Sequence, residues 1–190
     1  MRASETLPAT ANGAGWRLSD INPLVFVIIG LYVALALASD RFLVMSNQMN
    51  ITRQVAVYLI IALGQTFVIS SRGIDLSVGS ALGLCAAVVA TQIASGMPVW
   101  LAVVLGIGLG AAIGALNGLI ITKLQISPLI ATLGTLVAMR GATHLYYKHL
   151  YAHEVVSRLP RDIIYLGQGF VGPVPVPAII ALAMVLLAWF

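Results

Sequence analysis

Long runs of apolar residues, separated by short polar segments, dominate this sequence. No Asp, Glu, Lys or Arg occurs in residues 21–39, 54–71, 76–122 and 163–190. A membrane-crossing helix needs about 20 mostly apolar residues, and in hydrocarbon its backbone amides must be paired within the helix. The strict alternation of apolar and polar residues that marks a membrane β-strand is absent from these runs. The pattern therefore predicts an all-α, polytopic bundle of transmembrane helices.

Turn-forming residues inside and between these runs set the expected boundaries of the helices. The run at 76–122 is too long for one helix, and Ser95, Gly96 and Pro98 supply a turn that divides it. Pro128 suits the start of a helix, where its missing N–H costs nothing. We therefore expect membrane spans at about residues 21–38, 53–71, 76–94, 98–122, 128–147 and 177–190.

The remaining segments are expected to lie outside the membrane. Residues 1–20 are polar and rich in small side chains, which favours a flexible cytosolic tail, and residues 39–52 form a hydrated connection. Residues 148–176 combine charges with many Gly and Pro and form the longest predicted loop. The last apolar run, 177–190, extends only about 21 Å as a helix, so we expect the transmembrane domain to be truncated within its sixth span.

Composition agrees with this class of protein. Charged residues make up 8% of the 190 residues and hydrophobic residues 60%, and the mean hydropathy is +1.01. A soluble domain of this size cannot bury so much apolar surface. The net charge of +4 is scattered and forms no basic stripe with aromatic residues, so nucleic acid is not an expected partner. The single cysteine, Cys85, excludes an intrachain disulfide and is expected to pack inertly.

Small residues recur at every fourth position of the fourth predicted span. Small side chains let membrane helices approach closely, which favours a packing role. A period of four exceeds the helical period of 3.6, so the row turns by about 40° per step and is too wide for one straight contact. We therefore expect this helix to lie inside the bundle and to touch at least two neighbours through Ala102, Gly106, Gly110, Gly114 and Gly118.

Polar residues gather at the end of the second predicted span and in the turn that follows it. Gln65, Thr66 and Ser70 lie at membrane depth, where polar side chains favour an interior or water-lined face. The turn carries Arg72 and Asp75, and a negative charge near the next helix start suits the helix dipole. An interfacial cap and a role in transport both remain open for this signature turn, which comprises Arg72, Gly73, Asp75, Leu76, Ser77, Gly79 and Ser80.

Two further groups of polar residues invite other interpretations. Arg140 is the one charge well inside a predicted span, and its nearness to the outer end favours snorkelling to the interface. His149 and His153, with Glu154 beside them, have a spacing that suits a metal. They lie in a hydrated loop without a clear further ligand, so no metal site is expected.

Three blocks of sequence, in order, give a more specific indication. Gly-Ile-Asp-Leu-Ser-Val-Gly-Ser at 73–80 follows a Gly-x-Thr-Phe-Val-Ile helix. Ala-Leu-Asn-Gly-Leu at 115–119 precedes Ile-Ser-Pro-Leu-Ile-Ala-Thr-Leu-Gly-Thr at 126–135, and the third block begins with Leu-Gly-Gln-Gly at 166–169. Together, over about residues 43–190, they resemble the permease subunits of ribose/xylose/arabinose-type ATP-binding-cassette (ABC) sugar importers.

The resemblance implies an architecture similar to type II importer permeases in the bacterial inner membrane, with a cytosolic N-terminus. The predicted spans leave four Lys/Arg inside and five outside, so charge alone does not decide the orientation. The resemblance also implies a second permease subunit, identical or similar, a cytosolic ATPase and a periplasmic sugar-binding protein. For the translocation path it suggests Gln65, Thr66 and Ser70, followed by Thr132, Gly134 and Thr135.

The sequence does not suggest an enzyme. The phosphate-binding pattern Gly-x-x-x-x-Gly-Lys-Ser/Thr does not occur, so ATP and Mg²⁺ are expected in the partner ATPase and no cofactor in this chain. Two alternatives to an importer subunit remain. One is a secondary transporter or channel segment, in which the signature turn would serve ion coupling. The other is a truncated fragment that inserts in the membrane but transports nothing.

Overall fold

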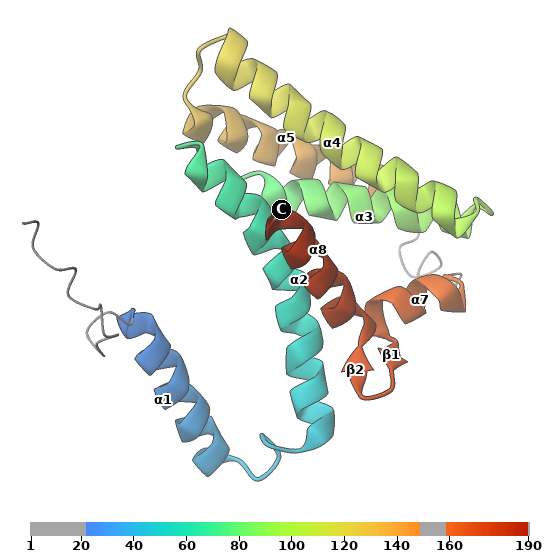
Figure 1. Ribbon diagram of the computed structural model, residues 1–190. Helices are drawn as coiled ribbons and strands as arrows, with labels where there is room; N and C mark the ends of the chain where they lie inside the picture. Colours follow the sequence, from blue (N-terminus) through green and yellow to red (C-terminus); the bar gives the residue numbers. More distant parts are fainter. Residues whose placement is uncertain (1–21, 149–158, 190) are drawn as a thin grey trace, which may run out of the picture. The chain divides into compact units, whose positions relative to one another are not determined.

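A computed structural model describes residues 22–148 and 159–189 of the chain (Figure 1). The predicted tail and the residues His149, His153 and Glu154 lie outside these ranges. The chain divides into two compact units, Met1–Gln48 and Met49–Phe190. The helices are α1 (Pro23–Ala38), α2 (Met45–Ser70), α3 (Val78–Ala94), α4 (Val99–Lys123), α5 (Pro128–Lys148), α7 (Arg161–Gln168) and α8 (Val176–Trp189).

The prediction of an all-α fold is confirmed, with one small exception among the described residues. Strands β1 (Phe170–Val171) and β2 (Val174–Pro175) form an antiparallel hairpin in which Phe170 pairs with Pro175. Gly172 begins the two-residue loop with φ +59°, a left-handed conformation that glycine adopts without steric cost. The hairpin stands between α7 and α8, and α8 contacts both α7 and β2.

The first unit holds α1 and the first turn of α2. The Asn22 side chain accepts a hydrogen bond from the Leu24 N–H at 3.0 Å and caps α1. The Tyr32 ring lies edge-on to Phe42, with 4.9 Å between ring centroids, and its hydroxyl donates to Gln48 at 2.8 Å. No residue of α1 is buried, and its apolar side chains face outward on all sides. Such a surface suits hydrocarbon rather than water.

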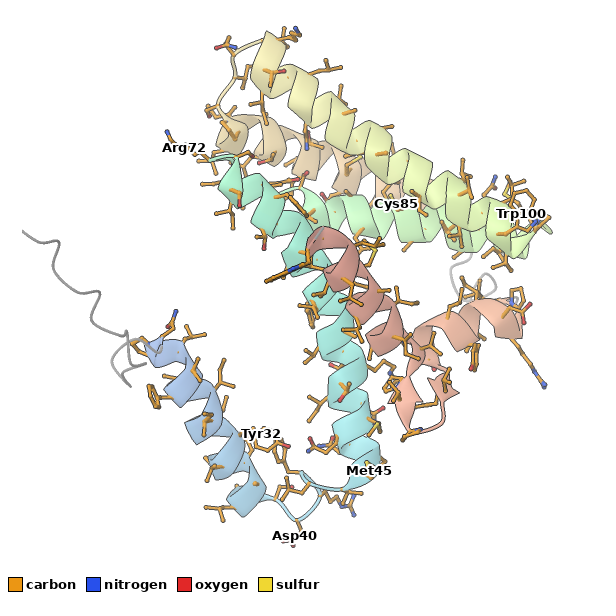
Figure 2. The ribbon with its side chains drawn as sticks, in the orientation of Figure 1. Tyr32, Asp40, Met45, Arg72, Cys85 and Trp100 are labelled. Carbon is orange, nitrogen blue, oxygen red and sulfur yellow. The ribbon has the colours of Figure 1, made fainter. Side chains whose placement is uncertain are left out.

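In the second unit, α3 packs against both α4 and α5, and α4 also contacts α5. Figure 2 shows Arg72 and Trp100 at opposite ends of this three-helix bundle, with Cys85 between them. The buried apolar residues of these helices are few, and half of them are alanines, as expected of helices that meet at close range. They are Leu84, Ala87, Ile93, Ala102, Ile113 and Ala131.

The close approach of α3 and α4 depends on Gly106. A Cβ added at Gly106 would lie 2.5 Å from Cγ2 of Val89, closer than side chains tolerate. Ala102 and Gly106 are buried, whereas the small-residue row turns away further along, so that Gly114 and Gly118 have open space around them. The buried face of α4 continues instead through Ile113 and Asn117, because a straight helix repeats every 3.6 residues.

The ends of the helices follow local turn chemistry. After α2 the chain turns through Arg72 at φ 60°, while the N–H of Arg72 bonds to Ile69 O and that of Gly73 to Val68 O. This is the bonding of a Schellman motif, with an arginine in the position that glycine usually takes. Gly96, at φ 96°, ends α3 in the same way, at the turn expected from the sequence.

Two of the described helices, α2 and α4, are long and apolar enough to cross a membrane by length and composition. Three more apolar helices, α1, α3 and α8, are shorter. Helix α2 begins at Met45, before the predicted start at 53. Its first turns are therefore formed by residues that were predicted to form a hydrated connection. Helix α3 begins at Val78, because residues 75–77 are used by a polar turn.

Candidate functional site: a buried polar network and two cavities beside α3

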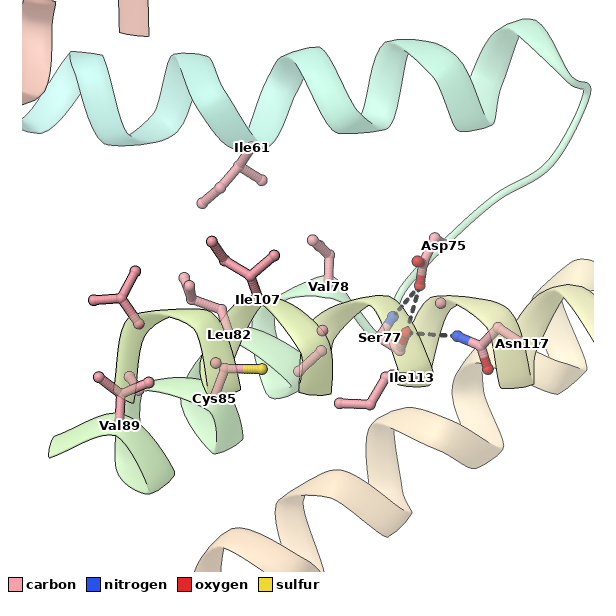
Figure 3. A pocket seen from close by; sticks show the side chains of 16 residues that line it. Ile61, Asp75, Ser77, Val78, Leu82, Cys85, Val89, Ile107, Ile113 and Asn117 are labelled. Carbon is pink, nitrogen blue, oxygen red and sulfur yellow. Dashed lines mark hydrogen bonds between the residues drawn. The ribbon is translucent and has the colours of Figure 1, made fainter. Parts of the chain in front are cut away.

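The turn before α3 is held by Asp75. Its Oδ1 accepts hydrogen bonds from the Ser77 N–H at 2.7 Å and from the Ser77 hydroxyl at 2.6 Å (Figure 3). An aspartate that bonds to the backbone two residues later stabilises a turn and competes with a helical conformation. The Ser80 hydroxyl donates to Ser77 O at 2.7 Å, inside the first turn of α3. These bonds fix the point at which α3 begins.

Asn117 of α4 connects this turn to the other two helices. Its Nδ2 donates to the Ser77 hydroxyl oxygen at 3.0 Å, and its Oδ1 accepts a short hydrogen bond from the Thr135 hydroxyl of α5. Ser77, Asn117 and Thr135 are all buried, with exposed fractions of 1%, 5% and 6%. One amide therefore joins α3, α4 and α5.

Two more side chains reach the backbone of the same turn. Thr132 donates to Pro128 O at 2.8 Å within α5 and also lies 3.2 Å from Ile74 O. Gln65 of α2 donates from Nε2 to Asp75 O at 3.0 Å. Residues from α2, α3, α4 and α5 therefore converge on the segment 74–77.

The network is saturated. Among the described residues, no buried side-chain nitrogen or oxygen lacks a hydrogen-bond partner, and no group of three His, Cys, Asp or Glu is placed to hold a metal. Buried polar groups whose partners are all present stabilise one arrangement of helices, since any rearrangement leaves a donor or acceptor unpaired. The network therefore serves to hold the helices together.

An apolar cavity of about 520 Å³ lies between α3 and α4 (Figure 3). Asp75, Ser77 and Asn117 close one end of it, and Ile61 of α2 faces it. The rest of its wall is apolar, with Leu82, Cys85, Val89, Ile107 and Ile113 among the lining residues.

A second cavity, of about 420 Å³, lies between α3 and α5. Its lining differs in kind, because it contains a guanidinium, an imidazole and two hydroxyls. The lining residues are Leu76, Gly79, Ser80 and Gly83 from the α3 side and Leu136, Arg140, Thr143 and His144 from α5. We refer to this cavity as the polar groove.

The structure places the residues suggested for the path in varied surroundings. Gln65 holds the turn at Asp75, and Thr66 donates to Ala62 O of its own helix at 2.8 Å. Ser70 is exposed at the end of α2, and Gly134 has open space around it. The hydroxyls of Thr132 and Thr135 are buried in the network. The role of these residues in transport stays a prediction.

The residues of the signature turn divide between the network and the polar groove. Asp75 and Ser77 belong to the network, and Leu76, Gly79 and Ser80 line the polar groove. Arg72 is exposed, and a Cβ at Gly73 would lie 3.2 Å from Val68, which explains the small residue there.

Sequence reasoning assigned no role to Asn117 or His144. A single Asn in the uncharged run 76–122 was an available signal for Asn117, because an unpaired amide is costly at membrane depth. For His144, the signal was its spacing of four from Arg140, which places both on one helical face.

Comparison with known proteins assigns this chain to a family. Residues 47–190, which contain the network and both cavities, match the family described as the branched-chain amino acid transport system permease component. The ribose import permease protein of Bacillus subtilis is 38% identical over 174 residues, 90% of this chain and 52% of that protein. The galactose/methyl galactoside import permease protein of Escherichia coli is 33% identical over 184 residues, covering 87% and 55%.

A third relative, the galactofuranose transporter permease protein of Escherichia coli, is 31% identical over 143 residues, covering 75% of this chain and 41% of that protein. The chain spans about half the length of the curated relatives it matches. No solved structure matches it. On the family match and these relatives, the chain belongs to the permease family of ABC importers whose members include the ribose and galactose import permeases.

Proposed function

We propose that this chain forms part of the membrane-embedded permease of a bacterial ABC importer that carries a monosaccharide or a related polyol. The observation that carries the proposal is the family match over 47–190, together with relatives named for ribose, galactose and galactofuranose. The apolar helices support a place in the inner membrane, since α1 exposes apolar side chains on every face.

The proposed partners rest on the family to which the chain belongs. Because it has no phosphate-binding loop, ATP hydrolysis is assigned to a separate cytosolic ATPase, which would also hold Mg²⁺. A periplasmic binding protein delivers the sugar, and a second permease subunit, identical or similar, completes the path. In this scheme the permease is not an enzyme.

In the proposed orientation the N-terminus, the signature turn and Lys123 lie in the cytosol, and residues 148–176 lie in the periplasm. The hydrogen bonds among Ser77, Asn117 and Thr135 support placing the signature turn and Lys123 on the same side of the membrane. They bring the start of α3 and the end of α4 close to α5. In this orientation the network holds the cytosolic ends of the three helices together. An ATPase that pushes on this side would move the three helices as one body.

The test is uptake by the full-length permease in liposomes with its ATPase and binding protein, using radiolabelled D-ribose and D-galactose as probes. We expect uptake of at least one probe that requires ATP and stops when the phosphate-binding lysine of the ATPase is replaced by alanine. Uptake that persists with that inactive ATPase and follows an ion gradient would support a secondary transporter instead. Absence of uptake of both sugars would contradict the proposal.

A further inference from the structure

Arg140 lies near the middle of α5, at a depth where a charge needs polar surroundings. It stands twelve residues after Pro128 and eight before Lys148, about 18 and 12 Å along the axis. The whole helix, at 21 residues, extends about 31 Å, close to the thickness of the hydrocarbon core. A guanidinium at this depth is costly unless it meets water, protein partners or a ligand.

The polar groove supplies those surroundings. Helices α3 and α5 run side by side in the same direction (Figure 1), so that residues near the start of α3 lie level with the second half of α5. The wall from α5 uses positions spaced by four, three and one, which fall on one helical face. These positions are Leu136, Arg140, Thr143 and His144.

Two glycines of α3 form part of the opposite wall and leave space in the groove. Gly79 and Gly83 line the groove, and a Cβ added to either would meet nothing within 4 Å. Close helix packing therefore does not require a glycine at these two positions, in contrast to Gly106. Their effect is to leave space in front of Arg140, within a cavity whose volume of about 420 Å³ suits a small molecule.

The polar groups of the groove have hydrogen-bonding capacity left for a ligand. Ser80 and Thr143 line the groove, and their hydroxyls donate to the oxygens of Ser77 and Met139, which leaves the hydroxyl oxygens able to accept hydrogen bonds. Within 22–148 and 159–189, the structure gives Arg140 and His144 no hydrogen-bond or ion-pair partner. The groove thus differs from the saturated network two turns away.

We propose that the polar groove is the part of the translocation path where the sugar is held, with Arg140 and His144 donating hydrogen bonds to its hydroxyl oxygens. The proposal rests on the proposed function and adds the location and the chemistry of binding. A polyol offers several lone pairs at close spacing, and a guanidinium presents five N–H donors in a planar fork. Its positive charge also opposes the passage of cations beside a neutral sugar.

The experiment measures initial rates of ATP-driven uptake of D-ribose and D-galactose by the reconstituted importer carrying single substitutions. Gly83→Leu adds a side chain whose Cβ meets nothing within 4 Å and whose outer atoms fill the groove, and we expect it to lower uptake at least tenfold. Arg140→Gln removes a charged donor and is expected to raise KM about tenfold, with Arg140→Lys intermediate. Matched controls are Gly108→Leu, on an exposed and uncrowded position of α4, and Arg41→Gln; both should leave uptake unchanged.

Two results would overturn the proposal while leaving the proposed function in place. One is a wild-type importer that takes up sugar while Gly83→Leu and Arg140→Gln retain wild-type rates and KM. The other is an Arg140→Gln variant that assembles poorly but shows a normal KM in the assembled fraction, which would mean that Arg140 pairs with a carboxylate of another protein segment. If the wild-type importer takes up neither sugar, the proposed function itself fails.

Discussion

The two cavities beside α3 differ in how their polar groups are used. On the α4 side the polar atoms of Asp75, Ser77 and Asn117 bond to one another, and the remaining wall is apolar. On the α5 side a guanidinium and an imidazole line the space without partners among the described residues. Adjacent residues of one helix face the two environments, since Ser80 lines the polar groove and Ala81 the apolar cavity.

A polar residue in a membrane helix therefore has no single role. Where donors and acceptors match, as at Asn117, the residue stabilises an arrangement of helices. Where donors are left over beside an open space, as at Arg140, the cost of placing a charge at membrane depth indicates contact with water or ligand. Saturation of hydrogen bonds, rather than polarity itself, separates structural from functional positions.

The largest effect on stability is expected on the tightly packed α3–α4 side. Gly106→Ala places a methyl group 2.5 Å from Val89 Cγ2, and a valine in a helix has little rotamer freedom to move away. We expect a loss of about 2 kcal/mol of unfolding free energy, measured by denaturant titration in detergent micelles. Gly108→Ala, with nothing within 4 Å of the new Cβ, is the matched control and should change stability by less than about 0.5 kcal/mol.

A double substitution tests the cause of that loss. With Val89→Ala in place, the nearest remaining atom is the Cβ of residue 89 at 4.0 Å from the added methyl group, an ordinary contact. Gly106→Ala should then cost much less than in the native background. Additive losses from the two substitutions would show that the contact between α3 and α4 is not the reason.

An intermediate effect is expected from the amide that joins three helices. Asn117→Leu fills a similar space but leaves the hydroxyls of Ser77 and Thr135 without their cross-helix partner. We expect a loss of about 1.5 kcal/mol by the same titration. Asn50→Leu, at an exposed position of α2, provides the comparison, and equal effects of the two substitutions would contradict a structural role for the network.

The smallest effect separates two threonines of one helix. Thr135 donates to Asn117 across the bundle, whereas Thr143 donates only to Met139 O of its own helix at 2.8 Å. Thr135→Val should lower stability by about 1 kcal/mol, and Thr143→Val by less than about 0.3 kcal/mol. A Thr143→Val variant as unstable as Thr135→Val would remove the distinction between the two cavities.

The sequence predicted the class of fold well, because hydrophobic runs and helix-ending residues act locally. The absence of charges over 76–122 and the turn at Gly96 were enough to place α3 and α4. The small-residue helix contacts two neighbours, α3 and α5, as expected, but of the five small residues expected to make these contacts only Ala102 and Gly106 are buried. At Arg72 the sequence predicted the turn but not its left-handed conformation, which carries no glycine signal.

The candidate site was harder to predict, because its meaning depends on contacts between distant residues. The resemblance suggested Thr132 and Thr135 for the path, but only the structure reveals that the hydroxyls of both are bonded in the interior. Arg140 was expected to snorkel because of its nearness to the outer end of the span in sequence. Which face of α5 it occupies, and the open space left by Gly83, follow from helix packing that one sequence does not contain.

Thiol accessibility at two adjacent positions of α3 distinguishes the polar groove from the apolar cavity. Ser80→Cys and Ala81→Cys are made separately in a Cys85→Ala background, and the assembled importer is treated with a charged, membrane-impermeant thiol reagent. We predict rapid modification at residue 80, slowed by the transported sugar, and little modification at residue 81. Equal modification of the two positions, or faster modification at 81, would contradict the assignment of the polar groove to the path.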